Sequence, residues 1–151
     1  MKYQIDQSIK IEDTRKTTYV CLTDGKKNVL ASISAKEKRI LKLYFRELQK
    51  PLIFKLFTFS SLCASALIKI KPKSVTINRE YIGHERQIKS FILQIFRIEG
   101  EAEPDINFSE IGKGAPAHKL AYAAKTRSKI ADILVIKSAI VLRYYEKTNK
   151  K

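Results

Sequence analysis

The order of apolar patterns along the chain constrains its fold more than any other feature. Three short runs near the N-terminus, at 3–6, 17–22 and 28–33, are apolar, aromatic or β-branched, and Asp24-Gly25 supplies a turn between the last two. Residues of these types favour strands, and a glycine turn between two such runs favours a hairpin. The first third of the chain therefore predicts an antiparallel meander of three strands.

Helical and extended patterns alternate after the meander. Ser34 begins a helix that Pro51 ends, with Glu37 in the capping-box position three residues on. Further expected elements are a mostly buried helix over 52–70 (a strand stays open there), a strand over 74–81, a helix over 85–97, a strand over 105–111, a helix from Pro116 to Lys125, and a helix or strand over 130–145. This order predicts an α/β fold: a mixed sheet of a three-strand antiparallel meander plus two parallel strands, flanked by helices.

The chain is strongly basic, and this bounds its partners. Its 151 residues, 44% of them hydrophobic, suit a single domain, which we expect over 1–146 with a basic tail over 147–151. Thirty Lys and Arg against fifteen Asp and Glu give a formal net charge of +15. Such an excess favours a polyanionic partner, and nucleic acid is the expected one. A solvated basic surface without a specific partner is the alternative.

The remaining composition points to a soluble, cytoplasmic protein with no membrane partner. Cys21 and Cys63 lie within apolar runs at no metal-ligand spacing, as is typical of buried thiols in a reducing compartment. The first residues lack the apolar core of a signal peptide. The longest apolar stretch, Leu56 to Ile68, is too short to span a bilayer.

Three polar residues stand at the ends of expected elements. Asp6 ends the first strand, Glu80 lies near the end of the 74–81 strand, and His118 falls in the first turn of the helix from Pro116. Burying an unpaired carboxylate is costly unless a cation offsets its charge. The dipole at a helix start favours the neutral imidazole that a metal ligand needs. Exposed acids and a structural histidine are the alternative interpretations.

The element order and three stretches together resemble the RNase H-like superfamily, in its RuvC-like, resolvase-type nuclease branch. The stretches are Ile5-Asp6-Gln7-Ser8, Val75 to Tyr81 and Gly112 to Tyr122, and by element order the resemblance covers nearly the whole chain. It implies that Asp6, Glu80 and His118 bind the catalytic metal, with Asn78, His84 and Glu85 as nearby alternatives. Where that family often has an acid one turn after its first helix ligand, this chain has Ala121 and Tyr122.

The resemblance implies a divalent-metal-dependent endonuclease that hydrolyses phosphodiester bonds in DNA or RNA. The cofactor would be Mg²⁺ or Mn²⁺, and an imidazole ligand favours Mn²⁺. Basic residues next to the three stretches are the expected phosphate contacts: Arg79, Arg86, Lys113, Lys119 and Lys125. The substrate form stays open among hybrid, branched, single-stranded and duplex nucleic acid. Junction resolvases act as dimers, so the apolar segment 130–145 suggests a homodimer.

A non-catalytic nucleic-acid-binding protein on the same fold is the alternative function, and it also explains the charge. It needs no convergent ligands, and Tyr81 or Tyr122 would stack on bases. A scaffold for an acidic protein partner is a third hypothesis. A metal-dependent shift in melting separates the first two, and salt dependence of binding separates the third.

Overall fold

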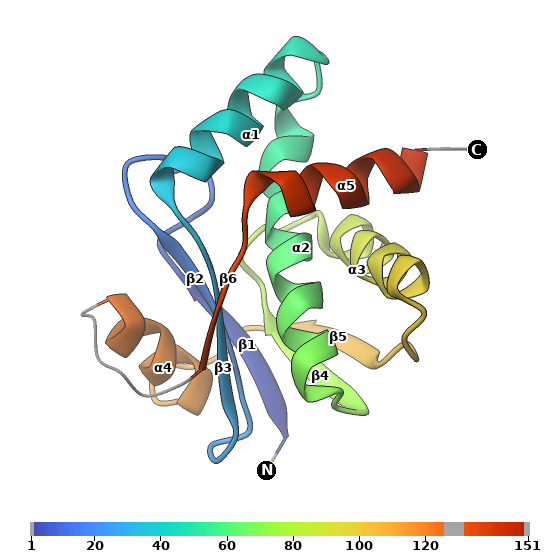
Figure 1. The fold of residues 1–151 in the computed structure, drawn as a ribbon. Coiled ribbons are helices and arrows are strands. Elements are labelled where there is room, and N and C mark those ends of the chain that lie inside the picture. Colours follow the sequence, from blue (N-terminus) through green and yellow to red (C-terminus); the bar gives the residue numbers. More distant parts are fainter. Residues whose placement is uncertain (1, 126–131, 150–151) are drawn as a thin grey trace.

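The computed structural model describes residues 2–125 and 132–149 as strands and helices around one sheet (Figure 1). The strands are β1 (Tyr3–Ser8), β2 (Thr18–Thr23), β3 (Asn28–Ile33), β4 (Ser74–Asn78), β5 (Asp105–Ser109) and β6 (Asp132–Val135). The helices are α1 (Ala35–Glu47), α2 (Pro51–Ile70), α3 (Glu85–Glu99), α4 (Pro116–Lys125) and α5 (Ser138–Asn149). The predicted elements up to residue 125 are therefore present, and 52–70 is helical.

The six strands form one mixed sheet in the order β5-β4-β1-β2-β3-β6. The meander pairs antiparallel, β1 with β2 and β2 with β3, while β4 lies parallel to β1 and β5 parallel to β4. The predicted α/β class and mixed sheet are confirmed. The prediction of five strands was one short, because β6 adds to the meander parallel to β3.

Segment 130–145 accounts for the sixth strand. Its described part divides into β6 and α5, and residues 130–131 lie outside the described residues. The helix continues to Asn149 and so enters the expected basic tail, of which residues 150–151 lie outside the described part. The segment, which was compatible with either a helix or a strand, thus contains a strand before residues 136–137 and a helix after them.

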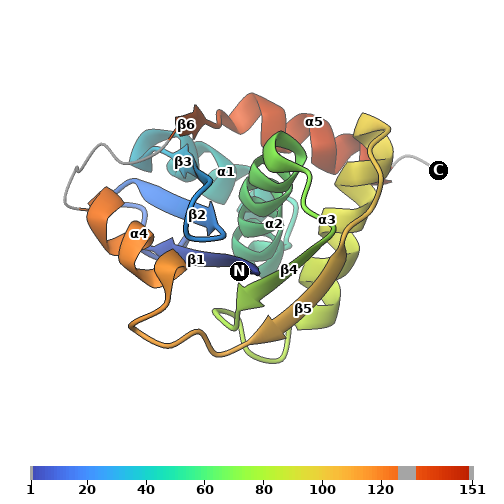
Figure 2. The ribbon, with the colours of Figure 1, turned by 90° about the horizontal axis from the view of Figure 1, so that it is seen from below.

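Helices cover the two faces of the sheet unequally (Figures 1 and 2). Helices α2, α3 and α5 form a layer on one side, with α1 packed against α2 and α5. Helix α4 stands on the other side, where it contacts β1 and β2. The face of β4 and β5 on the α4 side has no helix over it in either view.

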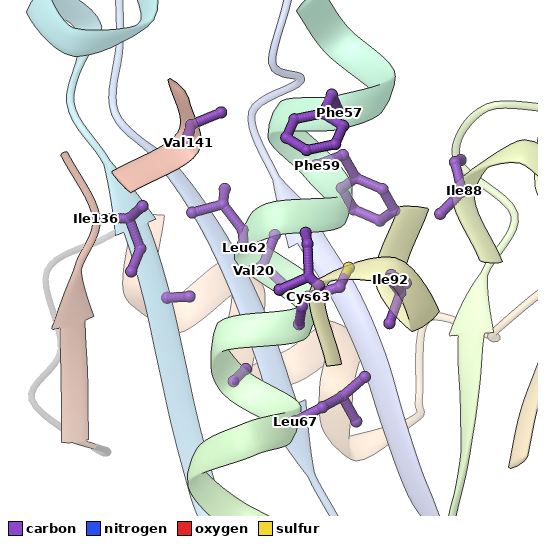
Figure 3. Packing of buried hydrophobic residues seen from close by; sticks show 14 of the residues in the cluster. Val20, Phe57, Phe59, Leu62, Cys63, Leu67, Ile88, Ile92, Ile136 and Val141 are labelled. Atoms are coloured by element: carbon purple, nitrogen blue, oxygen red, sulfur yellow. The ribbon is translucent and has the colours of Figure 1, made fainter. Parts of the chain in front are cut away.

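The main core surrounds α2 (Figure 3). Phe57, Phe59 and Leu62 of this helix are buried among Val20 of β2 and Ile92 of α3, with other apolar side chains. A smaller cluster lies under α4 and contains Cys21, Leu30, Leu120 and Ala121. Both thiols are free and buried, as the sequence predicts.

Helix α2 is long and apolar enough to cross a membrane by length and composition. The helix has 20 residues and is therefore longer than the apolar stretch from Leu56 to Ile68. The mean hydropathy of its most apolar window is 1.7. Within the fold, 67% of that window is buried, as in the core helix of a globular domain.

The start of α1 differs from the predicted capping box. Ser34 caps the helix, since its Oγ accepts a hydrogen bond from Glu37 N at 3.2 Å. The Glu37 carboxylate does not turn back to Ser34, however. Its Oε1 accepts from Ser138 N at 2.8 Å and from Ser138 Oγ at 3.1 Å, and so caps α5. Glu37 therefore joins the two helix starts.

Candidate functional site

Asp6 is a buried carboxylate in the middle of the sheet. It lies on β1 opposite Cys21 of β2, on the face that α4 covers, and only 3% of the residue is exposed. Its Oδ1 accepts from Gln7 N at 2.8 Å and from Asn78 Nδ2 at 3.3 Å. Its Oδ2 lies 3.0 Å from Nδ1 of His118. The alternative of a solvent-exposed turn acid is therefore wrong.

Glu80 lies beside Asp6, although not on the strand where it was predicted. Strand β4 ends at Asn78. A tight turn follows, in which Glu80 N donates a hydrogen bond to Asn78 O at 2.9 Å. Burial raises the pKa of Glu80 to about 7, and so do the hydrogen bond and the charge of Asp6. Hydrogen bonds from Asn78 and Gln7 oppose this rise. Two carboxyl groups thus share one partly buried space.

Asn78 holds both acids in place. Its Nδ2 donates to Asp6 Oδ1 and, at 2.7 Å, to Glu80 Oε1, while its Oδ1 accepts from Ile111 N at 2.8 Å. The last bond fixes the orientation of the amide, because only the carbonyl end can accept from a backbone N–H. Asn78 is one of the alternative ligands expected from the sequence. In the structure, its side-chain amide donates hydrogen bonds to both acids.

His118 reaches the site from α4, the helix that packs on β1 and β2. It lies in the first turn of α4, and its side chain is 41% exposed beside the buried Asp6. With the proton of the neutral ring on Nδ1 and directed at Asp6, Nε2 is left as an acceptor. A carboxylate that orients a histidine in this way is a common feature of metal-binding imidazoles.

The chain segments that carry these residues meet at one edge of the sheet. Strands β1, β4 and β5 are parallel, so their carboxyl ends lie at the same edge, where ligand sites of open α/β sheets are usually found. The segment after β5 leads to α4 and is tied to β4 through Ile111 N and through the bond from Arg79 N to Ser109 O at 3.1 Å.

Tyr81 supports this edge from the opposite face. Only 5% of it is exposed, and its ring packs edge-on against Phe59 with the centroids 5.2 Å apart. Its hydroxyl accepts from Gln7 Nε2 and Ile11 N and donates to Glu12 Oε1, each at 3.3 Å. The hypothesis that Tyr81 stacks on bases is therefore wrong for this conformation, because its ring is in the core. Tyr122 is 63% exposed and keeps that option.

Lys38 anchors the loop that follows β1, a role that no pattern in the sequence indicates. It is fully buried on α1, and its Nζ donates to Asp13 O at 2.5 Å and to Thr18 Oγ1 at 2.9 Å. Burial lowers its pKa to about 8, although Asp13 and Glu12 act in the opposite direction. Lysines are almost always exposed in folded proteins, so the burial of Lys38 was not predictable from the sequence.

The predicted phosphate contacts lie around the site with varied surroundings. Arg86, Lys113 and Lys119 are exposed, and Arg79 is exposed but pairs with Glu85 at 3.3 Å. Lys125 ends α4, and its side chain lies outside the described part. Of the alternative ligands, Glu85 pairs with Arg79 and accepts from Gly83 N, while His84 precedes α3 as its N-terminal cap residue.

Within residues 2–125 and 132–149, no three His, Cys, Asp or Glu side chains are grouped so that they could hold one metal ion as they stand. Asp6 contacts both Glu80 and His118 and is the centre of the three predicted residues. Comparison with protein-family models, curated proteins and solved structures gives no significant match to this chain.

Proposed function

We propose that this chain is a divalent-metal-dependent nuclease with an RNase H-like fold. The observation that carries the proposal is the pair of carboxyl groups at the carboxyl edge of β1 and β4, where Asp6 and its charge help to raise the pKa of Glu80 to about 7. Two acids held together in a basic protein leave a negative charge that a cation would balance.

The sheet topology supports the RNase H-like part of the proposal. Strands in the order β3-β2-β1-β4-β5, with an antiparallel meander and two further parallel strands, agree with the core that the resemblance implies. The first strand carries the Asp, and α4 follows the fifth strand with the His in its first turn. Strand β6 and helix α5 lie beyond that core.

The chemical types of the donors, rather than their present spacing, suit a divalent cation. Asp6 and Glu80 would supply carboxylate oxygens and His118 an imidazole nitrogen, a mixture that suits Mn²⁺ as well as Mg²⁺. Such a cation activates water and stabilises charge on the phosphate and the leaving oxygen when it is bound.

The remaining residues would orient the two acids and bind the phosphates of the substrate. Asn78 holds the acids at a fixed separation through its two amide contacts, and Ile111 N holds Asn78. Arg86, Lys113 and Lys119 are exposed near the same edge and would neutralise phosphates on either side of the cleaved bond. The basic residues around the two acids would favour the approach of a nucleic acid to the site.

Cleavage of labelled oligonucleotides tests the proposal. Duplex, hybrid, branched and single-stranded substrates are incubated with Mg²⁺ or Mn²⁺ and the wild type, Asp6→Asn, Glu80→Gln or His118→Ala. Glu85→Gln is the matched control, because this acid lies at the same edge but contacts Arg79 and not Asp6. We expect cleavage by the wild type and the control only. Loss of activity in Glu85→Gln equal to that in Glu80→Gln would contradict the assigned site.

Thermal unfolding tests metal binding independently of activity. A cation that binds only the folded state stabilises it by about 2.7 kcal/mol at a hundredfold excess over Kd. We expect Mn²⁺ to raise the Tm of the wild type but not of Asp6→Asn. An unchanged wild-type Tm at millimolar Mn²⁺ and Mg²⁺ would overturn the metal site.

One observation favours the non-catalytic alternative. Asp6 already accepts hydrogen bonds from Gln7 N and Asn78 and contacts His118, and a carboxylate satisfied in this way can be purely structural. Salt-dependent binding of oligonucleotides without cleavage or a metal-induced Tm shift would support that function.

A further inference from the structure

A small hollow lies next to the Asp6–His118 contact. Its volume is about 170 Å³, and it is lined by Gln7, Ser8 and Ile9 at the end of β1 and by His118, Ala121 and Tyr122 of α4. Because His118 forms part of both, the hollow adjoins the proposed cleavage site directly.

Tyr122 gives the hollow an aromatic wall. It follows His118 by four residues, which places both side chains on the same face of α4, one turn apart. The ring is 63% exposed, and among the described residues it is in none of the aromatic pairs. Sequence-independent binding of single strands uses rings of this kind, since every base has a face that can stack.

Ser8 lines the hollow, but its hydroxyl is shielded from the open space. It alternates with Gln7 along β1 and therefore shares the face of Asp6, under α4. Its Oγ is buried and has no hydrogen-bond partner among the described residues. Because this oxygen is not accessible to solvent, other atoms of Ser8 form the wall of the hollow at this place.

Ile9 fixes the rim of the hollow in an unusual conformation. Its φ is +61°, a left-handed value that β-branched residues rarely adopt. The turn at Ile9 leads the chain out of β1 directly after Ser8. Backbone strain of this kind is concentrated at ligand sites, where the surrounding structure maintains it.

We infer that this hollow binds one unpaired nucleobase, stacked on the exposed ring of Tyr122. The inference rests on the proposed function, since it takes the bound strand to be the one cleaved beside His118. A base within a duplex is paired and stacked on both sides and cannot enter such a space unless it leaves the helix. The preferred substrate therefore has an unpaired nucleotide next to the cleaved bond, as in a single strand, a frayed end or a branch.

Binding without cleavage tests the inference. Fluorescence anisotropy in EDTA compares a continuous duplex with the same duplex carrying one unpaired nucleotide and with a single strand, each as DNA and as RNA. The proteins are the wild type, Tyr122→Ala, Tyr122→Phe and Lys119→Ala. Lys119 is the matched control, because it is exposed on the same helix but lines no part of the hollow.

We expect the wild type to bind the unpaired substrates more tightly than the duplex. Loss of one stacked base in Tyr122→Ala should weaken that binding by roughly 5- to 150-fold and leave duplex binding unchanged, while Tyr122→Phe keeps the ring and the preference. Lys119→Ala should weaken all substrates alike. 2-Aminopurine at the unpaired position should be quenched by the wild type and Tyr122→Phe and not by Tyr122→Ala.

The outcomes separate the two proposals. Equal affinity of the wild type for the duplex and the unpaired substrates, or 2-aminopurine quenching that persists in Tyr122→Ala, overturns the base site and leaves the nuclease proposal standing. Failure of the wild type to bind any of the oligonucleotides overturns both.

Discussion

Oδ2 of Asp6 and Nδ1 of His118 lie 3.0 Å apart, although 112 positions separate the two residues in the chain. The contact joins β1 to α4, the helix that covers β1 and β2 on the face opposite α2. Asn78 meets the same carboxylate from β4. Residues from three separate segments thus meet at one buried acid, and changes at each of them should affect metal binding.

Replacement of Asn78 by Asp should make the folded protein dependent on a cation. The change keeps the shape of the side chain but replaces an amide that donates to Asp6 and Glu80 with a third carboxylate. We expect Asn78→Asp to lower the free energy of unfolding by about 1–3 kcal/mol in EDTA, since two acids lose a donor. Mn²⁺ should then raise its Tm more than that of the wild type.

Differential scanning fluorimetry with and without Mn²⁺ measures this effect. Asn107→Asp is the control, because Asn107 is exposed on β5, the strand next to β4, and makes no hydrogen bond to either acid within the described residues. A Mn²⁺-induced shift in Asn78→Asp no larger than in the wild type would argue against a cation at this place.

Removal of the Tyr81 hydroxyl should loosen the end of β1. In Tyr81→Phe the ring still packs on Phe59, but Gln7 Nε2 and Ile11 N lose their acceptor. An unpartnered buried donor costs about 1–3 kcal/mol, so urea unfolding should show a loss of that size. Because β1 also carries Asp6, we expect kcat for cleavage to fall while oligonucleotide affinity in EDTA stays within twofold. An unchanged midpoint would mean that these long hydrogen bonds contribute little.

Lys38 should make stability rise with pH above about 8. Burial lowers its pKa in the folded state to about 8, against an ordinary value of 10.5. Between these two values the unfolded chain holds the proton that the folded chain has released, so the free energy of unfolding increases with pH. Below pH 8 both states are protonated and the contribution is constant.

Comparison with Lys38→Met isolates this effect from the other lysines. Urea unfolding at pH 7, 8, 9 and 10 should show a rise of about 1–3 kcal/mol in the wild type relative to the variant. A difference between the two proteins that is the same at every pH would show that Lys38 keeps its ordinary pKa.

Periodicity and turn residues were sufficient to predict most of the fold. Strand alternation and the Asp24-Gly25 turn give the meander, and Pro51 marks the start of α2. Strand β6 was not predictable, because its pairing with β3 joins Val29 to Asp132 across most of the chain. Such long-range pairing leaves no local pattern, and β-branched residues in a helical phase fit both structures.

The candidate site was predictable in its residue types but not in its arrangement. The sequence indicates Asp6, Glu80 and His118 near element ends, but β1 continues past Asp6 to Ser8 and β4 ends before Glu80. That Asn78 would contact both acids depends on the register Ile5 with Ile77, which brings Asn78 next to Asp6. The tight turn after Asn78, which takes Glu80 off the strand, forms through backbone contacts that its residue types do not signal.

Salt dependence should locate the part of the +15 charge that binds nucleic acid. If the carboxyl edge of the sheet is the interface, each of Arg86→Ala, Lys113→Ala and Lys119→Ala removes one phosphate contact and reduces the slope of log K against log salt by about 0.9 for a duplex. Lys69→Ala is the control, because this exposed lysine near the end of α2 lies at the amino edge of β4, away from the site. Titrations from 50 to 200 mM salt should therefore separate the three variants from the control. Equal slopes for all four would place the interface elsewhere, since a charge outside the contact releases no counterion.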